Sequence, residues 1–142
     1  MKKLFVHFLL FGLMVLSVGC DESNGDNSTS QNSLTGKWKM TAAYISAGGP
    51  QYWVTVEDGE EIEFFANGTF ISSRNPECRT GTYVVEGEEL SLEFDCDGFE
   101  SVMENEEGLI TYNIEFNKNE FLLSPTSILC IEGCSYKYVK NE

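Results

Sequence analysis

Apolar and polar side chains alternate along several short segments of this chain, and no other feature of the sequence constrains its fold as strongly. Segments 91–95 (SLEFD) and 109–116 (LITYNIEF) show the pattern most clearly. A period of two places one set of side chains on each face of a β-strand. There is no helical stripe of useful length, and only the segment between Ala47 and Glu61 could hold a short helix or a lid. The sequence therefore predicts an all-β protein with little helix.

Turn-forming residues separate these segments at close intervals. Asn67-Gly68 suits a two-residue type I′ turn, which would place Phe65 opposite Phe70. Further turns are predicted at 86–89, 95–98, 105–108 and 117–120. We therefore expect eight or nine strands, at 37–46, 61–66, 69–74, 80–86, 89–95, 99–104, 109–116, 120–124 and 135–140. Consecutive short hairpins predict an antiparallel up-and-down meander that closes into a β-barrel.

The first 19 residues have the features of an export signal. Lys2 and Lys3 precede an apolar run that ends near Val18, and this run is shorter than the roughly 20 residues that a membrane-spanning helix needs. Residues 17–20 (SVGC) resemble the lipobox of bacterial lipoproteins, although Leu16 lies one position earlier than the usual leucine. The resemblance implies that residues 1–19 are a lipoprotein signal peptide and that Cys20 is lipidated. Ordinary cleavage after residue 19 is the alternative.

A wholly polar segment, residues 21–33 (DESNGDNSTSQNS), follows this cysteine and is predicted to be a flexible tether. Asp21 and Glu22 resemble signals that route some bacterial lipoproteins to the cell surface, and simple solvation is the alternative. We therefore expect an exported protein that is lipid-anchored to the bacterial outer membrane, on its periplasmic or cell-surface face. Residues 34–142 would form the single folded domain.

Cysteine counting agrees with this interpretation, because lipidation of Cys20 leaves an even number of thiols for an oxidising compartment. If the strands on either side of residues 86–89 pair with each other, the cysteines at 78 and 96 come within disulfide reach. We therefore expect one disulfide between Cys78 and Cys96 and another between Cys130 and Cys134. The two other connectivities of four cysteines remain open.

The charge balance argues against several functions. Without its first 19 residues the chain has seven basic and 23 acidic residues, a formal charge of −16, so we expect no nucleic-acid binding. The only histidine, His7, lies in the signal, and no serine or cysteine lies in a nucleophile elbow, so we expect no enzymatic activity. The carboxylates of segments 56–63 (VEDGEEIE) and 86–89 (EGEE) are interpreted as solvated turn residues. No cofactor or metal site is expected, because oxidised cysteines do not bind zinc and segment 95–98 (DCDG) lacks the rest of a calcium loop.

Residues 34–40 (LTGKWKM) resemble the Gly-x-Trp opening of the first lipocalin strand. Together with FFANGTF, GTYVVEGEELSLEF and CIEGCSYKYVK, they make residues 34–142 similar to the lipocalin-like domains of small bacterial lipoproteins. The resemblance implies an up-and-down β-barrel of the calycin type with an apolar cavity.

Inward-facing residues of alternating strands would line such a cavity, and most of them are expected simply to fill the core. The candidates by alternation are Trp38, Met40, Tyr44, Ile62, Phe64, Tyr83, Leu92, Phe94, Tyr112 and Ile114. Segment 48–56 (GGPQYWVTV) corresponds to the loop that covers the open end in lipocalins, so its two aromatic residues could cover a ligand, and packing on the barrel wall is the alternative. The residues predicted to bind a ligand are Trp38, Tyr44, Tyr52, Trp53, Phe64, Tyr83, Phe94 and Tyr112.

Three functional hypotheses follow. The first is a membrane-anchored, non-enzymatic binding module for a small hydrophobic molecule in the cell envelope. The second is a structural or interaction barrel with a solid core, which docks an envelope protein partner through its acidic surface. The third is a protease or hydrolase inhibitor that presents a loop.

Overall fold

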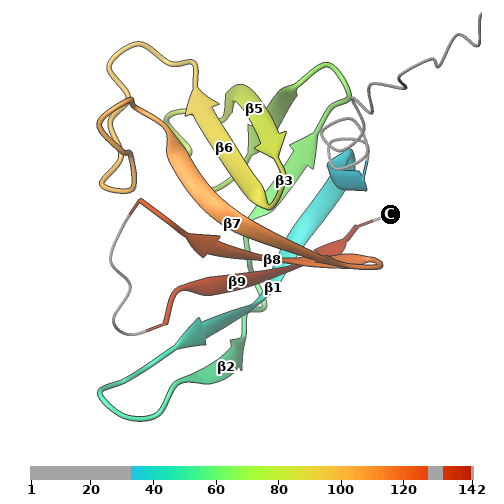
Figure 1. The fold of residues 1–142 in the computed structure, drawn as a ribbon, viewed down its shortest axis with the longest axis vertical. Coiled ribbons are helices and arrows are strands. Elements are labelled where there is room, and N and C mark those ends of the chain that lie inside the picture. The colour runs from blue at the N-terminus through green and yellow to red at the C-terminus, as the bar shows by residue number, and fades with distance from the viewer. Residues whose placement is uncertain (1–32, 128–132, 142) are drawn as a thin grey trace, which may run out of the picture.

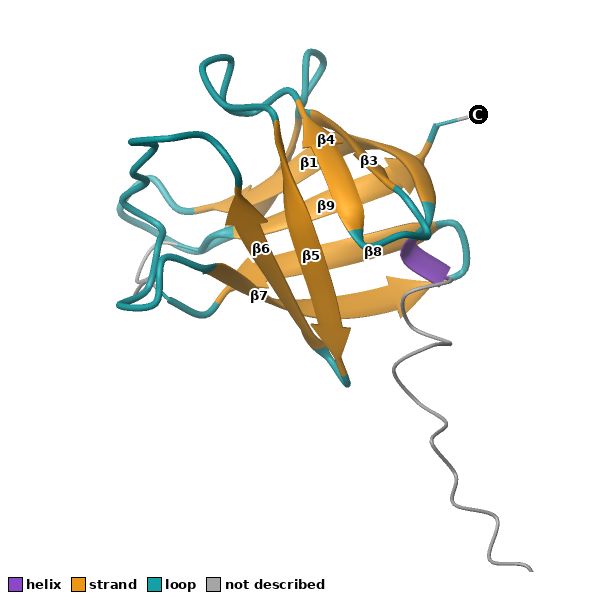
Figure 2. Ribbon diagram, turned by 90° about the horizontal axis from the view of Figure 1, so that it is seen from above, coloured by secondary structure: helices purple, strands orange, loops and turns teal. Residues whose placement is uncertain are grey.

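Nine antiparallel strands form one sheet that closes on itself in the computed structural model, which describes residues 33–127 and 133–141 (Figures 1 and 2). The strands are β1 (Gly36–Ile45), β2 (Tyr52–Thr55), β3 (Glu61–Phe64), β4 (Thr69–Ser72), β5 (Thr80–Glu86), β6 (Glu89–Phe94), β7 (Ile110–Asn117), β8 (Glu120–Pro125) and β9 (Ser135–Lys140). From β3 to β9 each strand pairs with the next, and β1 pairs with β2, β3 and β9. The predicted up-and-down barrel is confirmed, with eight closed strands and β2 as an extra one.

β2 and β3 follow each other along one edge of β1 and act as a single strand divided at residues 56–60. The Val56 backbone N–H donates to the Thr41 carbonyl oxygen at 2.9 Å, and the Met40 N–H donates to the Glu60 carbonyl oxygen at 2.8 Å. A Cβ atom on Gly59 would lie 1.9 Å from the Met40 carbonyl oxygen. The close backbone approach therefore requires glycine at this position.

One predicted strand is absent and one observed strand was not predicted. Residues 99–104 form no strand and contribute only one isolated bridge, between Glu104 and Ile110. The Ser101 hydroxyl oxygen accepts a hydrogen bond from the Met103 N–H at 3.2 Å and the Ser101 carbonyl oxygen accepts one from the Glu104 N–H at 3.1 Å, which favours a turn within this segment over a strand. Conversely, β2 lies in the segment between Ala47 and Glu61, for which the sequence predicts no strand. The glycines and proline at 48–50 indicate a loop and mask the β-forming residues that follow them.

The turn between β3 and β4 differs by one residue from the prediction, because Phe70 pairs with Phe64 and not with Phe65. The Gly68 N–H donates to the Phe65 carbonyl oxygen at 3.0 Å. Gly68 has a φ of 83°, whereas Asn67 has no positive φ, and a type I′ turn needs positive φ at both central residues. A three-residue loop that ends in glycine therefore replaces the two-residue loop. The rings of Phe64 and Phe70 remain neighbours, with centroids 6.3 Å apart.

The hairpin of β5 and β6 has the predicted register, and its open end has the predicted disulfide. Gly81 pairs with Phe94, and Cys78 and Cys96 are bonded. The bond closes a loop with a sequence separation of 18, for which chain entropy alone corresponds to about 3 kcal/mol of stability. Cys134 is disulfide-bonded as well, and Cys130, its expected partner, lies outside the described residues.

The two ends of the barrel differ in their connections. Short turns join β3 to β4, β5 to β6 and β7 to β8 at one end, which we call the closed end. The longer connections 46–51, 73–79 and 95–109 lie at the opposite end, which we call the open end, and the β1–β2 and β6–β7 connections extend to the left in Figure 1. No helix of the described residues is long and apolar enough to cross a membrane.

Fully buried apolar side chains fill the closed half of the barrel. The Trp38 indole lies against Phe121, with ring centroids 4.7 Å apart, and its Nε1–H donates to the Leu34 carbonyl oxygen at 2.6 Å. The largest buried apolar side chains are Trp38, Tyr138, Phe64, Phe70, Phe121, Leu34, Leu90, Ile114 and Val85. They pack as one cluster, so the closed half is a solid core.

Candidate ligand-binding end of the barrel

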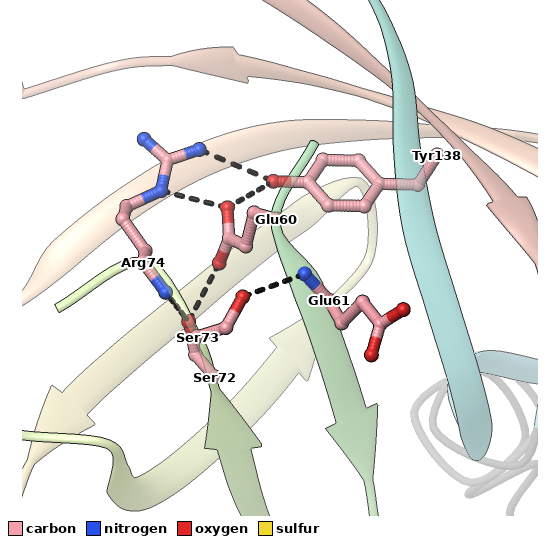
Figure 3. A network of polar contacts seen from close by, with 6 residues as sticks. All are labelled: Glu60, Glu61, Ser72, Ser73, Arg74 and Tyr138. Atoms are coloured by element: carbon pink, nitrogen blue, oxygen red, sulfur yellow. Dashed lines mark hydrogen bonds and ion pairs between the residues drawn. The ribbon is translucent and has the colours of Figure 1, made fainter. Parts of the chain in front are cut away.

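A buried polar network lies inside the barrel between the solid core and the open end (Figure 3). Glu60 Oε2 accepts hydrogen bonds from Arg74 Nε at 2.7 Å and from the Tyr138 hydroxyl at 2.6 Å. Glu60 Oε1 accepts a third from Ser72 Oγ at 2.7 Å. Arg74 Nη2 donates to the Tyr138 hydroxyl oxygen at 3.2 Å. The side chains of Glu60 and Arg74 are 8% and 26% exposed, so this ion pair is largely withdrawn from water.

Three strands bring these side chains together. Glu60 directly precedes β3, in phase with the inward-facing Ile62, and Arg74 follows β4, in phase with the inward-facing Ser72. Tyr138 belongs to β9, which pairs with β1 at Met40. The interpretation of the carboxylates in segment 56–63 as solvated is therefore wrong for Glu60. Its phase with the apolar residues of β3 was the signal that could have identified it.

The network controls the ionisation of its members. Burial lowers the pKa of the Arg74 guanidinium, but the neighbouring Tyr138 and Glu60 outweigh burial and raise it above its ordinary value. Burial raises the pKa of Tyr112 to about 12, with a smaller contribution from Glu60, while Arg74 opposes the rise. Burial and the adjacent Glu60 raise the pKa of Tyr138 well above its ordinary value. At neutral pH the guanidinium is therefore charged and both phenols are protonated.

Raising the pH above 10 is expected to destabilise the folded protein. In the unfolded chain both phenols ionise near pH 10, whereas the folded pKa of Tyr112 is about 12 and that of Tyr138 is also raised. The protonated phenols therefore contribute stability that is fully present below pH 10 and is lost as the pH rises toward the folded pKa, roughly 3 kcal/mol for Tyr112. Urea unfolding at intervals between about pH 8 and 12 measures the loss. A Tyr112→Phe variant with the same loss as the parent would contradict this assignment.

A bulge in β1 determines the orientation of Tyr44, one of the predicted ligand-binding residues. The pairing of β1 with β9 shifts by one residue between Met40 and Ala42. Met40 faces inward before this bulge, and Ala43, rather than Ala42 or Tyr44, faces inward after it. Tyr44 therefore faces outward, and the prediction that it lines the interior is wrong. Its ring lies 5.1 Å from that of Trp53, its partner on β2.

Trp53 packs on the outer wall of the barrel. It is 43% exposed, and Lys137 Nζ lies 5.6 Å from its ring centroid. Tyr52 is 50% exposed and pairs with Ile45, on the opposite face of the β1–β2 hairpin from Trp53. Both aromatic residues thus belong to a strand and not to a loop, and Tyr52 alone is turned toward the inner side.

The other predicted ligand-binding residues all face inward, but at different depths. Trp38, Phe64, Tyr83 and Tyr112 are buried in the core. Four inward-facing apolar side chains are only partly buried and pack against this core from the open end: Met40, Phe94, Met103 and Tyr136. The Arg74 guanidinium lies 4.9 Å from the centroid of the Tyr136 ring. We call these four side chains, together with Arg74, the open-end surface.

Four hollows formed by described residues lie away from the open-end surface. One of about 130 Å³ lies mainly between the outward side chains of Lys37, Glu61, Glu63, Ile71 and Arg79. Three others, of about 370, 460 and 410 Å³, lie over β5 and β6 or beside the turns of the closed end. They are open to solvent, so they lack the enclosure typical of sites for small apolar ligands.

Within residues 33–127 and 133–141, one group of potential metal ligands lies close together, at Cys78, Asp95 and Cys96. The two sulfur atoms are bonded to each other and therefore offer no thiolate to a metal ion. The Asp95 carboxylate instead accepts a hydrogen bond from the Thr80 hydroxyl at 2.6 Å. This group is a structural crosslink at the end of β6.

Comparison with known proteins places this barrel in a family. Residues 34–123 match the family described as the lipocalin-like domain. No curated protein matches the chain. Two similar solved structures each share 20% sequence identity with it: a lipocalin-like protein from Bacteroides uniformis ATCC 8492 (TM-score 0.49, covering 77% of this chain and 99% of that one) and an uncharacterized protein from Bacteroides eggerthii DSM 20697 (TM-score 0.47, covering 76% and 99%). The family match covers well over half of the sequence, and the chain therefore belongs to the lipocalin-like domain family.

Proposed function

We propose that this protein is a lipid-anchored, non-enzymatic binding module of the bacterial outer membrane, which takes a small and largely apolar molecule at the open end of its barrel. Membership of the lipocalin-like family supports a binding role. The observation that carries the proposal is the contrast between the two ends: the inward side chains of the closed half are fully buried, whereas those of the open-end surface remain accessible to solvent. A ligand would cover this accessible apolar area and gain its hydrophobic free energy.

Binding of an uncharged fluorescent probe tests this function. N-phenyl-1-naphthylamine should bind the mature protein saturably, with a rise in fluorescence. Met103→Glu places a charge in the open-end surface and should weaken probe binding about tenfold or more. Val102→Glu is the matched control, because Val102 is 96% exposed, and it should leave binding unchanged. Equal binding by the two variants, or no saturable binding to the parent, would contradict the proposal.

The anchor is the second part of the proposal. It is supported by the sequence around Cys20 and by the Cys78–Cys96 disulfide, which suits an oxidising compartment outside the cytoplasm. Two acyl signals are needed for stable attachment to a membrane, and a diacylated cysteine would supply them. Cys20→Ala should therefore move the protein from the membrane fraction to the soluble fraction of a cell lysate. Retention in the membrane fraction would rule out Cys20 as the anchor.

A second candidate is an interaction barrel that docks an envelope protein through its acidic outer face. The solid core of the closed half and the outward position of the described hollows favour it. In this case the probe should not bind in the barrel, and the Met103→Glu variant should behave like Val102→Glu.

A further inference from the structure

Arg74 has an unused hydrogen-bonding edge. Its guanidinium carries five N–H donors. Its Nε donates to Glu60 and its Nη2 to Tyr138 (Figure 3), and Nη1 donates to none of the other described residues. Among these residues no buried side-chain nitrogen or oxygen lacks a partner. The Arg74 side chain is 26% exposed, and its Nε and Nη2 are turned toward Glu60 and Tyr138, so we infer that the end of the guanidinium formed by Nη1 and Nη2 is its accessible part.

The neighbours of Arg74 hold this edge in place. Both carboxylate oxygens of Glu60 are engaged, Oε2 by Arg74 and Tyr138 and Oε1 by Ser72. Glu60 therefore cannot turn toward the free edge without giving up these bonds. The Tyr136 ring lies against the guanidinium, with its centroid 4.9 Å from Cζ. The guanidinium is thus fixed both along its inner edge and on one face, so little conformational freedom is lost when its free edge binds a ligand.

Partly buried apolar side chains lie at the same end of the barrel as the free edge, and one of them, Tyr136, lies against the guanidinium. Met40, Phe94, Met103 and Tyr136 form the rest of the open-end surface. Beyond them, the inner side of the β1–β2 hairpin carries Ile45, Tyr52 and Val54. A cation within such a surface matches a ligand with an apolar body and one anionic group. Two parallel N–H donors fit the two oxygens of a carboxylate better than a single hydroxyl oxygen.

We propose that Arg74 binds the carboxylate of a small amphiphilic ligand through Nη1 and Nη2, while the apolar body of the ligand lies against Met40, Phe94 and Met103. This inference rests on the function proposed above and names the chemical class of the ligand. Glu60 offsets part of the charge attraction, so the preference for a carboxylate comes mainly from the paired hydrogen bonds. Glu60 and Tyr136 are positioning residues for the guanidinium.

Dodecanoate and dodecan-1-ol distinguish the carboxylate from the apolar body, because they share the same chain length. Each would be titrated into the mature protein by displacement of N-phenyl-1-naphthylamine. Dodecanoate should bind about tenfold or more tightly than dodecan-1-ol. Arg74→Gln should abolish this preference, and Arg74→Lys, which keeps the charge but loses the paired donors, should retain only part of it. Near-ultraviolet circular dichroism checks that both variants remain folded.

Arg79→Gln provides the matched control, because Arg79 is an exposed arginine that lines the outer hollow. It removes the same charge and should leave the preference for dodecanoate intact. Equal affinities of the parent for dodecanoate and dodecan-1-ol would overturn the role of Arg74 while leaving the binding function in place. The same loss of preference in Arg79→Gln and Arg74→Gln would do so too. Failure of both C12 compounds to bind would overturn the inference and the proposed function together.

Discussion

Trp38→Ala is expected to lower the free energy of unfolding by about 3–5 kcal/mol. The side chain is 1% exposed and belongs to the core cluster of the closed half, edge to face with Phe121. Truncation would leave a cavity, remove an aromatic pair and deprive the Leu34 carbonyl oxygen of its hydrogen-bond donor. A domain of this size has a total stability of roughly 5–15 kcal/mol, so a large part of the stability margin would be lost.

Trp53→Ala is the matched control for this truncation. It removes the same side chain from the outer wall, where Trp53 is 43% exposed, and should cost about 1 kcal/mol or less. Urea unfolding of the parent and the two variants, followed by circular dichroism, measures the difference. Equal destabilisation by the two substitutions would mean that Trp38 does not hold the core together.

The strands whose patterns are strictly local could be predicted from the sequence. The hairpin of β5 and β6 alternates regularly and turns at Gly87, which has a φ of 63°, so its register and the disulfide beyond it follow from counting. The turn at Asn67 and Gly68 could not be fixed in this way, because the same residues suit a two-residue or a three-residue loop. Only packing of the flanking strands decides between them.

Features that depend on partners distant in the sequence could not be predicted. Tyr44 faces outward because of the bulge opposite β9, and the residues alone do not indicate that bulge. Glu60 and Arg74 are charged, and charged residues are usually exposed, so alternation alone does not predict that they are buried. They are buried together because β3, β4 and β9 converge, which brings Tyr138 within hydrogen-bond distance of both.

Glu60→Leu is expected to destabilise the protein by about 3 kcal/mol, because it leaves the Arg74 guanidinium and the Tyr138 hydroxyl without their acceptor inside the barrel. We take the lower end of the usual range, since Arg74 is 26% exposed and water can partly solvate it. Arg74→Met should cost less, because Tyr138 and Ser72 would still donate to Glu60. The double variant Glu60→Leu, Arg74→Met should be more stable than Glu60→Leu alone, since a pair of apolar side chains leaves no unpaired charge.

A double-mutant cycle built from urea unfolding at neutral pH gives the coupling free energy between the two residues, and we expect about 1.5 kcal/mol or more. The exposed cross-strand pair of Lys37 and Glu63, with Nζ 3.8 Å from Oε2, supplies the matched cycle through Lys37→Met and Glu63→Leu. Exposed ion pairs contribute little, so its coupling should stay below about 1 kcal/mol. Additive effects at Glu60 and Arg74 would show that the two side chains act independently. The guanidinium would then lack the fixed orientation that its proposed contact with a carboxylate requires.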